Sequence, residues 1–170
     1  MKKITFLLLL LVFHSFARDS YVIATLEHID SNTQLKFQYQ NSLFSCKQYG
    51  IYGLDTFLVT PIVSPYCKQR VKAVLKRHPS MRYFGQNHLH IKQGYHLRFF
   101  NQECQLFSAG TKSYAEVLVE EGIAVVEPKF KNRDYYYYQL QKAQRRAKFN
   151  TRGIWEEFGM DACIQSLYKE

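Results

Sequence analysis

The sequence is poor in the residues that mark several specialised protein classes. Its 170 residues include only eight glycines, four prolines and one tryptophan, which excludes a collagen-like chain. The longest apolar run, residues 4–13, has about ten residues, whereas a membrane-spanning helix needs roughly 20. The composition therefore excludes a polytopic membrane protein, and a coiled coil as well.

Common catalytic motifs are also missing. The chain has no glycine-rich phosphate loop, no HExxH and no GxSxG, and its four cysteines form no CxxC pair. Negative charge is scarce as well, because Asp55 is the only carboxylate residue between residues 31 and 102. None of the motifs typical of nucleophilic hydrolases, zinc proteases or thiol redox proteins therefore indicates a function for this chain.

The residues that are abundant indicate a folded, basic domain. Hydrophobic residues make up 46% of the chain and charged residues 22%, as in globular proteins. Lys and Arg number 23 against 14 Asp and Glu, and the chain has 13 Tyr and 13 Phe. A basic, aromatic-rich surface suits a polyanion such as nucleic acid.

The first residues have the layout of a secretory signal peptide. Lys2 and Lys3 precede the apolar run, and Ser-Phe-Ala at residues 15–17 places small residues where a signal peptidase cleaves. We expect a signal peptide at residues 1–17 and one domain at residues 18–170 with a short C-terminal tail. The protein is then exported, periplasmic or secreted, with no stable membrane insertion once the signal is removed.

Export changes the interpretation of the four cysteines. An oxidising compartment favours pairing, so we expect at least one disulfide among Cys46, Cys67, Cys104 and Cys163. Four cysteines allow three pairings, and the sequence does not choose among them. The alternative for Cys104 is a buried free thiol, because its surroundings are apolar.

The order of elements predicts an α+β fold. Strands are expected at residues 21–26, 34–39 and 43–54, in a β region at 81–109 and briefly at 124–126. Helices are expected at residues 65–79, 112–121 and 133–149, with a possible final turn at 161–167. A curved antiparallel sheet with helices on one side fits this order, and an OB-type barrel is one such fold.

Four segments resemble the thermonuclease family, the staphylococcal-nuclease-like domains. They are YAEVLVEEGIA at residues 114–124, Gly-Ile-Trp at 153–155, HIDSNT at 28–33 and GIYGLDT at 50–56. The resemblance spans most of the chain and leaves residues 58–92 unassigned. It implies a five-stranded OB-type barrel with about three helices.

The resemblance also implies a Ca²⁺-dependent phosphodiesterase of DNA and RNA. Such an enzyme needs carboxylates on the cation, a carboxylate that positions water, and two arginines on the phosphate. By the resemblance, the two metal carboxylates fall on Asn32 and Asp55, and the two arginines fall on Gly50 and Gln102. The glutamate that positions water falls on Leu58. Asp55 alone is retained, although Asp30 and Arg98 are possible substitutes at the cation site and for the second arginine.

We therefore expect an exported, catalytically degenerate domain that binds nucleic acid or another polyanion and needs no cofactor. The binding face is expected on the helix at residues 133–149, through Tyr136, Lys142, Arg145 and Arg146. An ordinary amphipathic helix with snorkelling cations is the simpler interpretation of that face. Two other functions stay open: an active Ca²⁺-dependent extracellular nuclease with a rearranged site, and an envelope module that binds a protein partner.

Overall fold

The computed structural model describes residues 21–61, 63–100, 103–108, 110–127 and 135–167. The predicted signal peptide and residue 102 lie outside this part of the chain. The elements in chain order are β1 (Val22–Ile29), β2 (Gln34–Tyr39), β3 (Ser42–Gln48), β4 (Ile51–Gly53), α1 (Leu54–Val59), α2 (Pro65–Arg77), η1 (Pro79–Tyr83), α3 (Phe84–His88), β5 (Gly94–Phe100), β6 (Glu103–Phe107), α4 (Tyr114–Glu120), β7 (Ala124–Val126), α5 (Tyr135–Phe149), η2 (Gly153–Glu156) and α6 (Met160–Ser166).

Five strands form a closed barrel in the order β1-β2-β3-β6-β5. The β3–β6 pair is parallel and the other pairs are antiparallel, with β5 returning to β1. Alternate residues point inward, so Phe37, Leu97 and Leu106 are fully buried in the barrel. The predicted α+β class with a five-stranded OB-type barrel is confirmed.

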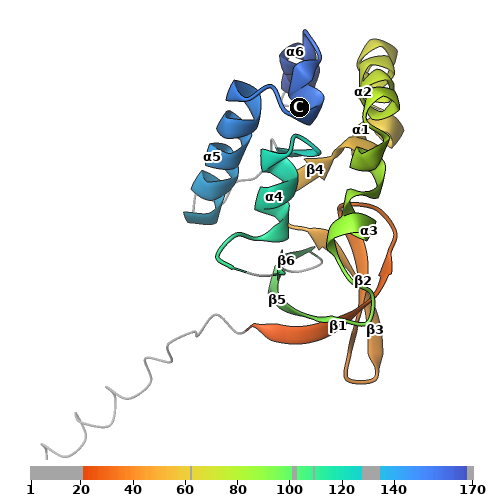
Figure 1. Cartoon of the computed structure of the whole chain (residues 1–170), viewed down its shortest axis with the longest axis vertical. Coiled ribbons are helices and arrows are strands. Elements are labelled where there is room, and N and C mark those ends of the chain that lie inside the picture. Colours follow the sequence, from red (N-terminus) through yellow and green to blue (C-terminus); the bar gives the residue numbers. More distant parts are fainter. Residues whose placement is uncertain (1–20, 62, 101–102, 109, 128–134, 168–170) are drawn as a thin grey trace, which may run out of the picture.

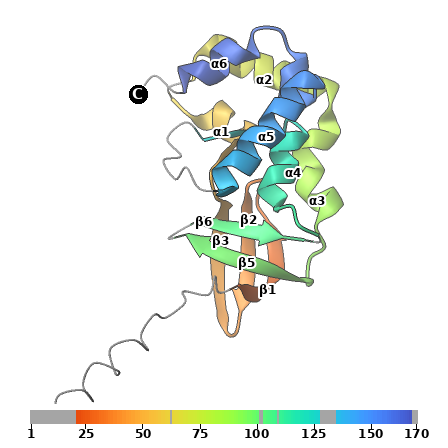
Figure 2. The same ribbon diagram turned by 90° about the vertical axis from the view of Figure 1, so that its left-hand side faces the viewer.

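The helices gather at one end of the barrel. Figures 1 and 2 show α2, α5 and α6 beyond one end of the strands, with α4 between α5 and the barrel. The short β4 and β7 pair with each other in a separate two-stranded sheet and connect the barrel to this helical layer. Gly122 ends α4 with φ of 67°, the left-handed conformation that favours glycine at this position.

Two disulfides join distant parts of the chain, so the predicted pairing of the cysteines is confirmed. Cys46 of β3 is bonded to Cys104 of β6, and Cys67 of α2 is bonded to Cys163 of α6. Cys104 is therefore not a free thiol. No helix in the described parts of the chain is long and apolar enough to cross a membrane.

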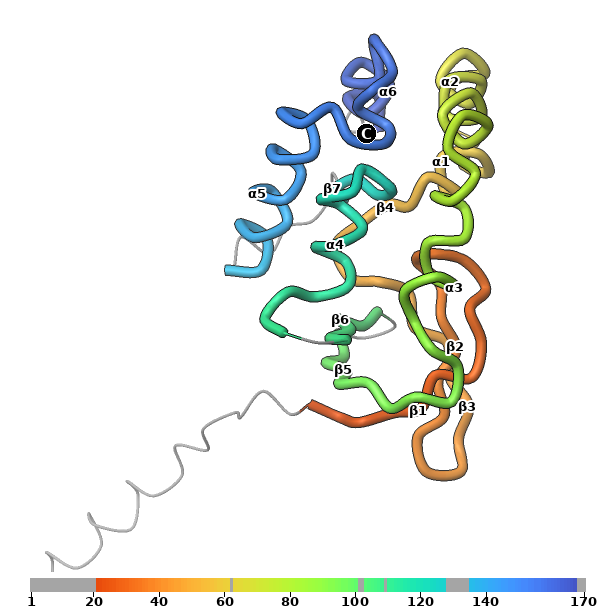
Figure 3. The backbone as a smooth tube through the Cα atoms, in the orientation of Figure 1, coloured from red at the N-terminus to blue at the C-terminus, as the bar shows by residue number. Residues whose placement is uncertain are grey.

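The prediction of about three helices was too low, because the described residues contain six α-helices and two 3₁₀ helices. Residues 54–59 form α1, where the sequence pattern predicts a strand that continues to Leu54. Residues 79–88 form η1 and α3, where the pattern predicts the start of a β region. Figure 3 traces this second segment from α2 down to the barrel before the chain enters β5.

Candidate functional site

Asn32 occupies the position of the first metal carboxylate in the family resemblance, and in this chain its amide bridges two elements. It lies in the turn between β1 and β2. Its Nδ2 donates to the Met81 carbonyl at 2.6 Å, and its Oδ1 accepts from the Gly85 N–H at 2.8 Å. The side chain thus holds η1 and the start of α3 against the end of the barrel.

This contact is closely packed. A Cβ added at Gly85 would lie 3.1 Å from the Tyr114 hydroxyl and 3.4 Å from Asn32 Oδ1. Tyr114 is itself buried, and burial raises the pKa of its hydroxyl well above the usual value. Both the donor and the acceptor of the Asn32 amide are therefore bound to backbone groups of the protein.

Asp55, the retained carboxylate, lies in the first turn of α1. Its Oδ1 accepts from the Thr56 N–H at 3.0 Å. A Cβ at Gly53 would collide with this same oxygen and with the Thr33 side chain, so the carboxylate lies close to Gly53. The glycine provides the space that the Asp55 carboxylate uses.

The other carboxylate that could have joined the site already has basic partners. Asp30 lies 3.2 Å from Lys36 Nζ and 3.4 Å from His28 Nε2. Within the described residues, no group of three or more His, Cys, Asp or Glu side chains is arranged to hold a metal ion. The residues at these positions do not fit the calcium site that the family resemblance implies.

Two of the remaining positions that the family resemblance assigns to catalysis, Gly50 and Leu58, have structural roles in the fold. Gly50 has φ of 77° in the turn between β3 and β4, so an arginine there would adopt a strained backbone. Leu58 packs partly buried against the core from α1. The position of the second arginine, Gln102, lies outside the described residues.

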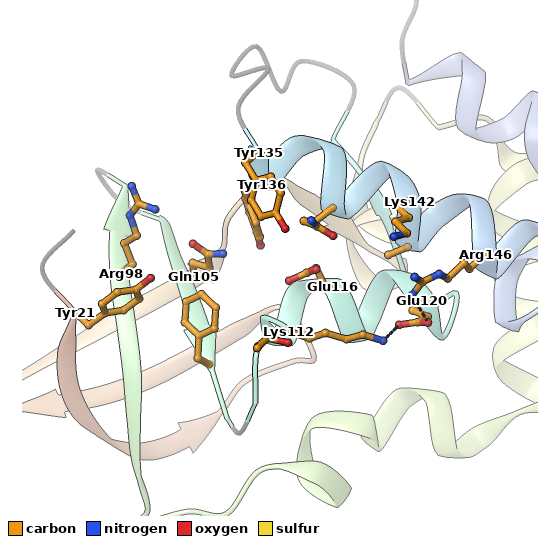
Figure 4. A pocket seen from close by; sticks show the side chains of 14 residues that line it. Tyr21, Arg98, Gln105, Lys112, Glu116, Glu120, Tyr135, Tyr136, Lys142 and Arg146 are labelled. Atoms are coloured by element: carbon orange, nitrogen blue, oxygen red, sulfur yellow. Dashed lines mark hydrogen bonds and ion pairs between the residues drawn. The ribbon is translucent and has the colours of Figure 1, made fainter. Parts of the chain in front are cut away.

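A cleft of about 590 Å³ lies elsewhere, between the barrel and the helical layer. Its walls are the outer face of β5 and β6 on one side and α4 and α5 on the other. Figure 4 shows Tyr21 and Arg98 on the barrel side, Tyr135 and Tyr136 on α5, and Glu116 between them. Asn32, Asp30 and Asp55 are not among the lining residues.

Cations outnumber carboxylates in this cleft. Its lining includes Arg98, Lys112, Lys142 and Arg146. Of its two carboxylates, Glu120 binds Lys112, and its other oxygen lies 3.2 Å from Arg146 Nη1 (Figure 4). Burial acts to raise the pKa of Glu120, but the hydrogen bonds from these two cations outweigh it and hold that pKa below the usual value.

The second carboxylate, Glu116, is part of a capping box at the start of α4. It accepts from the Ser113 N–H at 2.7 Å and from the Ser113 hydroxyl at 3.0 Å, while the Glu116 N–H donates to Ser113 Oγ. The carboxylate is therefore turned toward its own helix terminus. Both negative groups of the cleft already have partners in the protein.

The predicted binding residues of α5 do not all lie together. Lys142 and Arg146 line the cleft, whereas Arg145 is exposed and is not among the lining residues. The ring of Tyr136 is only 8% exposed and stacks on Tyr49 with centroids 5.9 Å apart. The ring of Tyr136 is therefore largely buried in the core although it lines the cleft, and its role in binding stays a prediction.

Several cleft residues were not predicted as site residues. Tyr21 and Lys112 come from segments far from α5, and no local pattern links them to it. Tyr135 belongs to the run of four tyrosines, but the sequence does not say which members point outward. Tyr135 is 78% exposed and Tyr138 58% exposed, so these two tyrosines are the exposed members of the run.

Residues 100–157 match a family model described as staphylococcal nuclease homologue. The matched residues include β6, α4, β7, α5 and η2. The match agrees with the family resemblance over this part of the chain. The closed five-stranded barrel is consistent with the OB-type fold that the resemblance implies. A search of curated proteins finds no match. Asn32, Gly50, Asp55 and Leu58 precede the matched residues, so their assignment to catalytic positions stays a prediction.

Proposed function

We propose that this protein is an exported staphylococcal-nuclease-like domain that binds nucleic acid and has lost the family's hydrolytic chemistry. The observation that carries the proposal is the double hydrogen bond of Asn32 to Met81 and Gly85. The group that would be a cation ligand in the family is used in this chain to hold a segment of the fold.

Loss of hydrolysis follows from the chemistry of the substituted groups. A side chain such as Leu58 cannot orient an attacking water, and a glycine at position 50 cannot stabilise charge on a phosphate. Removal of one such group commonly lowers kcat by about 100- to 1000-fold. Several losses together leave no efficient route through the family mechanism.

Nucleic-acid binding is supported by charge and by the cleft. The formal net charge of the whole chain, with the predicted signal peptide included, is +9. The cleft beside α5 has four cations against two carboxylates that are already paired or capped. The two disulfides are compatible with an oxidising compartment, and we place the protein in the periplasm or outside the cell.

Fluorescence anisotropy of labelled oligonucleotides tests the binding. We expect saturable binding at low salt, equal in Ca²⁺ and in EDTA because no cation site is involved. The logarithm of the association constant should fall with the logarithm of salt concentration, with a slope of about −0.7 for each phosphate contacted on a single strand. An absence of binding at low salt would overturn the proposal and favour an envelope module with a protein partner.

A further inference from the structure

The cleft beside α5 is lined by the outer face of the barrel strands β5 and β6 and by one face of the helix α5. In β5 the side chains of Tyr95 and Leu97 are buried in the barrel, so the side chain of Arg98 points out of it. Arg98 lies opposite Gln105 of β6, and both line the cleft. The α5 residues that line it are spaced along one stripe of the helix, at positions 135, 136, 139, 142, 143 and 146.

The carboxylates that line the cleft among the described residues are engaged by groups other than Lys142. Lys112 and Arg146 share Glu120, and Glu116 is held by Ser113. Lys142 is exposed and makes no ion pair within the described residues. The cleft can therefore accept an anionic group at Lys142 without first breaking an ion pair of that side chain.

Aromatic side chains lie at the other end of the cleft. Tyr21 is 50% exposed and Tyr135 78% exposed, and the two face the cleft from opposite walls (Figure 4). The Tyr21 ring packs against the edge of Phe107, with centroids 5.6 Å apart and an interplanar angle of 76°. Tyr21 is thus packed against Phe107 and still has exposed surface toward the cleft.

We propose that this cleft binds a short stretch of single-stranded nucleic acid, with a phosphate at Lys142 and a base against Tyr135 or Tyr21. The inference rests on the proposed function and specifies its ligand. Exposed rings can stack only on bases whose faces are accessible, and base pairing and stacking hide those faces in a duplex. The volume of about 590 Å³ is that of a small-ligand pocket, suited to one or two nucleotides.

The binding surface so defined excludes Asn32 and Asp55, which the family resemblance assigns to catalysis, but it includes Arg98, the possible substitute for the second arginine. Asn32 and Asp55 do not line the cleft, and the segment that Asn32 holds packs on another part of the barrel. A strand bound in the cleft is therefore away from the one retained carboxylate. Binding without cleavage follows from this separation as well as from the substitutions.

Two variants of the full protein test the proposal, and each is paired with a matched control on the same helix. Lys142→Glu reverses a charge in the cleft, and Arg145→Glu makes the same change at an exposed position outside its lining. Tyr135→Ala removes a ring of the cleft, and Tyr138→Ala removes an exposed ring outside it. Anisotropy with a labelled oligothymidylate measures the dissociation constant of each variant, and thermal unfolding confirms that each is folded.

We expect the two variants in the cleft to lose affinity for the oligonucleotide and the two controls outside it to keep theirs. Lys142→Glu weakens binding by at least about tenfold and makes the salt slope shallower by about 0.7, as expected for one phosphate contact. Tyr135→Ala weakens it by about 5- to 150-fold, which corresponds to the 1–3 kcal/mol typical of stacking on one base. Arg145→Glu and Tyr138→Ala stay within about twofold of the parent, and a duplex of the same sequence competes poorly.

Four outcomes overturn the inference, and the first two of them leave the proposed function standing. Equal losses in Lys142→Glu and Arg145→Glu mean that binding is spread over the helix rather than placed in the cleft. Equal affinity for the single strand and the duplex means that bases are not read by stacking. Displacement of the oligonucleotide by heparin, with heparin binding insensitive to Tyr135→Ala, identifies an acidic polysaccharide as the ligand. Failure of the parent protein to bind any oligonucleotide overturns both proposals.

Discussion

The side chain of Asn32 both donates and accepts a hydrogen bond, which an aspartate at that position cannot do. An ionised carboxylate has acceptor oxygens only, so it could accept from the Gly85 N–H but could not donate to the Met81 carbonyl. Two oxygens would then face each other across a contact of 2.6 Å. Asn32, which the family resemblance places at a cation ligand, therefore makes two contacts in this fold that an aspartate could not both make.

We expect Asn32→Asp to destabilise the protein rather than create a calcium site. Loss of the donated hydrogen bond leaves the Met81 carbonyl facing a negative charge, at a cost of about 1–3 kcal/mol in the free energy of unfolding. Urea denaturation at neutral pH, monitored with the disulfides intact, measures this cost. Asn41→Asp, in the exposed turn between β2 and β3, makes the same chemical change and should alter the midpoint little.

The calcium dependence of the same variant separates the two interpretations of position 32. If Asn32 only holds η1 and α3, millimolar Ca²⁺ leaves the melting temperature of Asn32→Asp unchanged. A rise in melting temperature specific to Ca²⁺ would mean that Asp55 and the new carboxylate converge on a cation. That result would contradict a purely structural role for Asn32.

At the scale of elements, Glu157 connects the chain after η2 to α2. Its carboxylate binds Arg77 and lies 2.9 Å from Arg70 Nη1. The hydrogen bond from Arg77 is the main cause that lowers the pKa of Glu157, and the charge of Arg70 adds to it. The ion pairs therefore join two segments that are far apart in the sequence.

The lowered pKa of Glu157 predicts how stability depends on pH. A carboxyl whose pKa is lower in the folded state stabilises the protein above its unfolded pKa, and this contribution is lost as pH falls through the folded pKa. We expect the free energy of unfolding of the parent protein to decrease as the pH is lowered past about 4.5. Glu157→Gln should be less stable than the parent at neutral pH, and its free energy of unfolding should decrease less over the same acidic range.

Glu121→Gln provides the control, because Glu121 makes an exposed pair with Arg152. Its urea midpoint should follow that of the parent protein throughout the acidic range and up to neutral pH. Parallel curves for the parent and Glu157→Gln over that interval would show that Glu157 does not contribute through its charge.

The sequence predicted the elements with a regular pattern and missed those set by packing. Alternating apolar residues such as Leu35 and Phe37 identify a strand without help from the rest of the fold. Residues 54–59 and 79–88 are too short for a clear helical period, and contacts such as those of Met81 and Gly85 with Asn32 help to hold the second segment. In α5 the four tyrosines surround the helix, so only the packing of Tyr136 on Tyr49 shows which side is buried.

At the scale of the whole molecule, one disulfide joins barrel strands and the other joins helices. Cys46–Cys104 crosses the parallel β3–β6 pair, which closes the barrel, and Cys67–Cys163 joins α2 to α6 across 96 residues of sequence. A long loop loses much conformational freedom in the unfolded chain when it is closed. The second disulfide therefore ties the last helix to the rest of the helical layer.

We expect the double substitution Cys67→Ala and Cys163→Ala to lower the free energy of unfolding by about 2–5 kcal/mol. Oligonucleotide affinity should be unchanged at temperatures where the variant is folded, because neither cysteine lines the cleft. Urea denaturation and anisotropy measure the two quantities on the same sample. A loss of affinity in a fully folded variant would mean that α6 takes part in binding.

The candidate cleft could not be predicted from the sequence, because it combines residues from separate parts of the chain that only the whole fold brings together. Tyr21 precedes β1, Arg98 lies on β5, Lys112 precedes α4 and Lys142 lies on α5. The sequence did indicate a basic, aromatic helix near the C-terminus. Which of its cations face the barrel depends on how α5 packs, and this excluded Arg145 while including Lys142.

The length of a bound oligonucleotide is the most direct test of the whole account. A labelled single strand is incubated with excess purified protein and millimolar Ca²⁺ for many hours, and its length is then read by denaturing electrophoresis. We expect the strand to be bound and to keep its full length, with or without Ca²⁺. Shortening that requires Ca²⁺ and is abolished by Asp55→Asn would show that the hydrolytic site is intact, and would contradict the account.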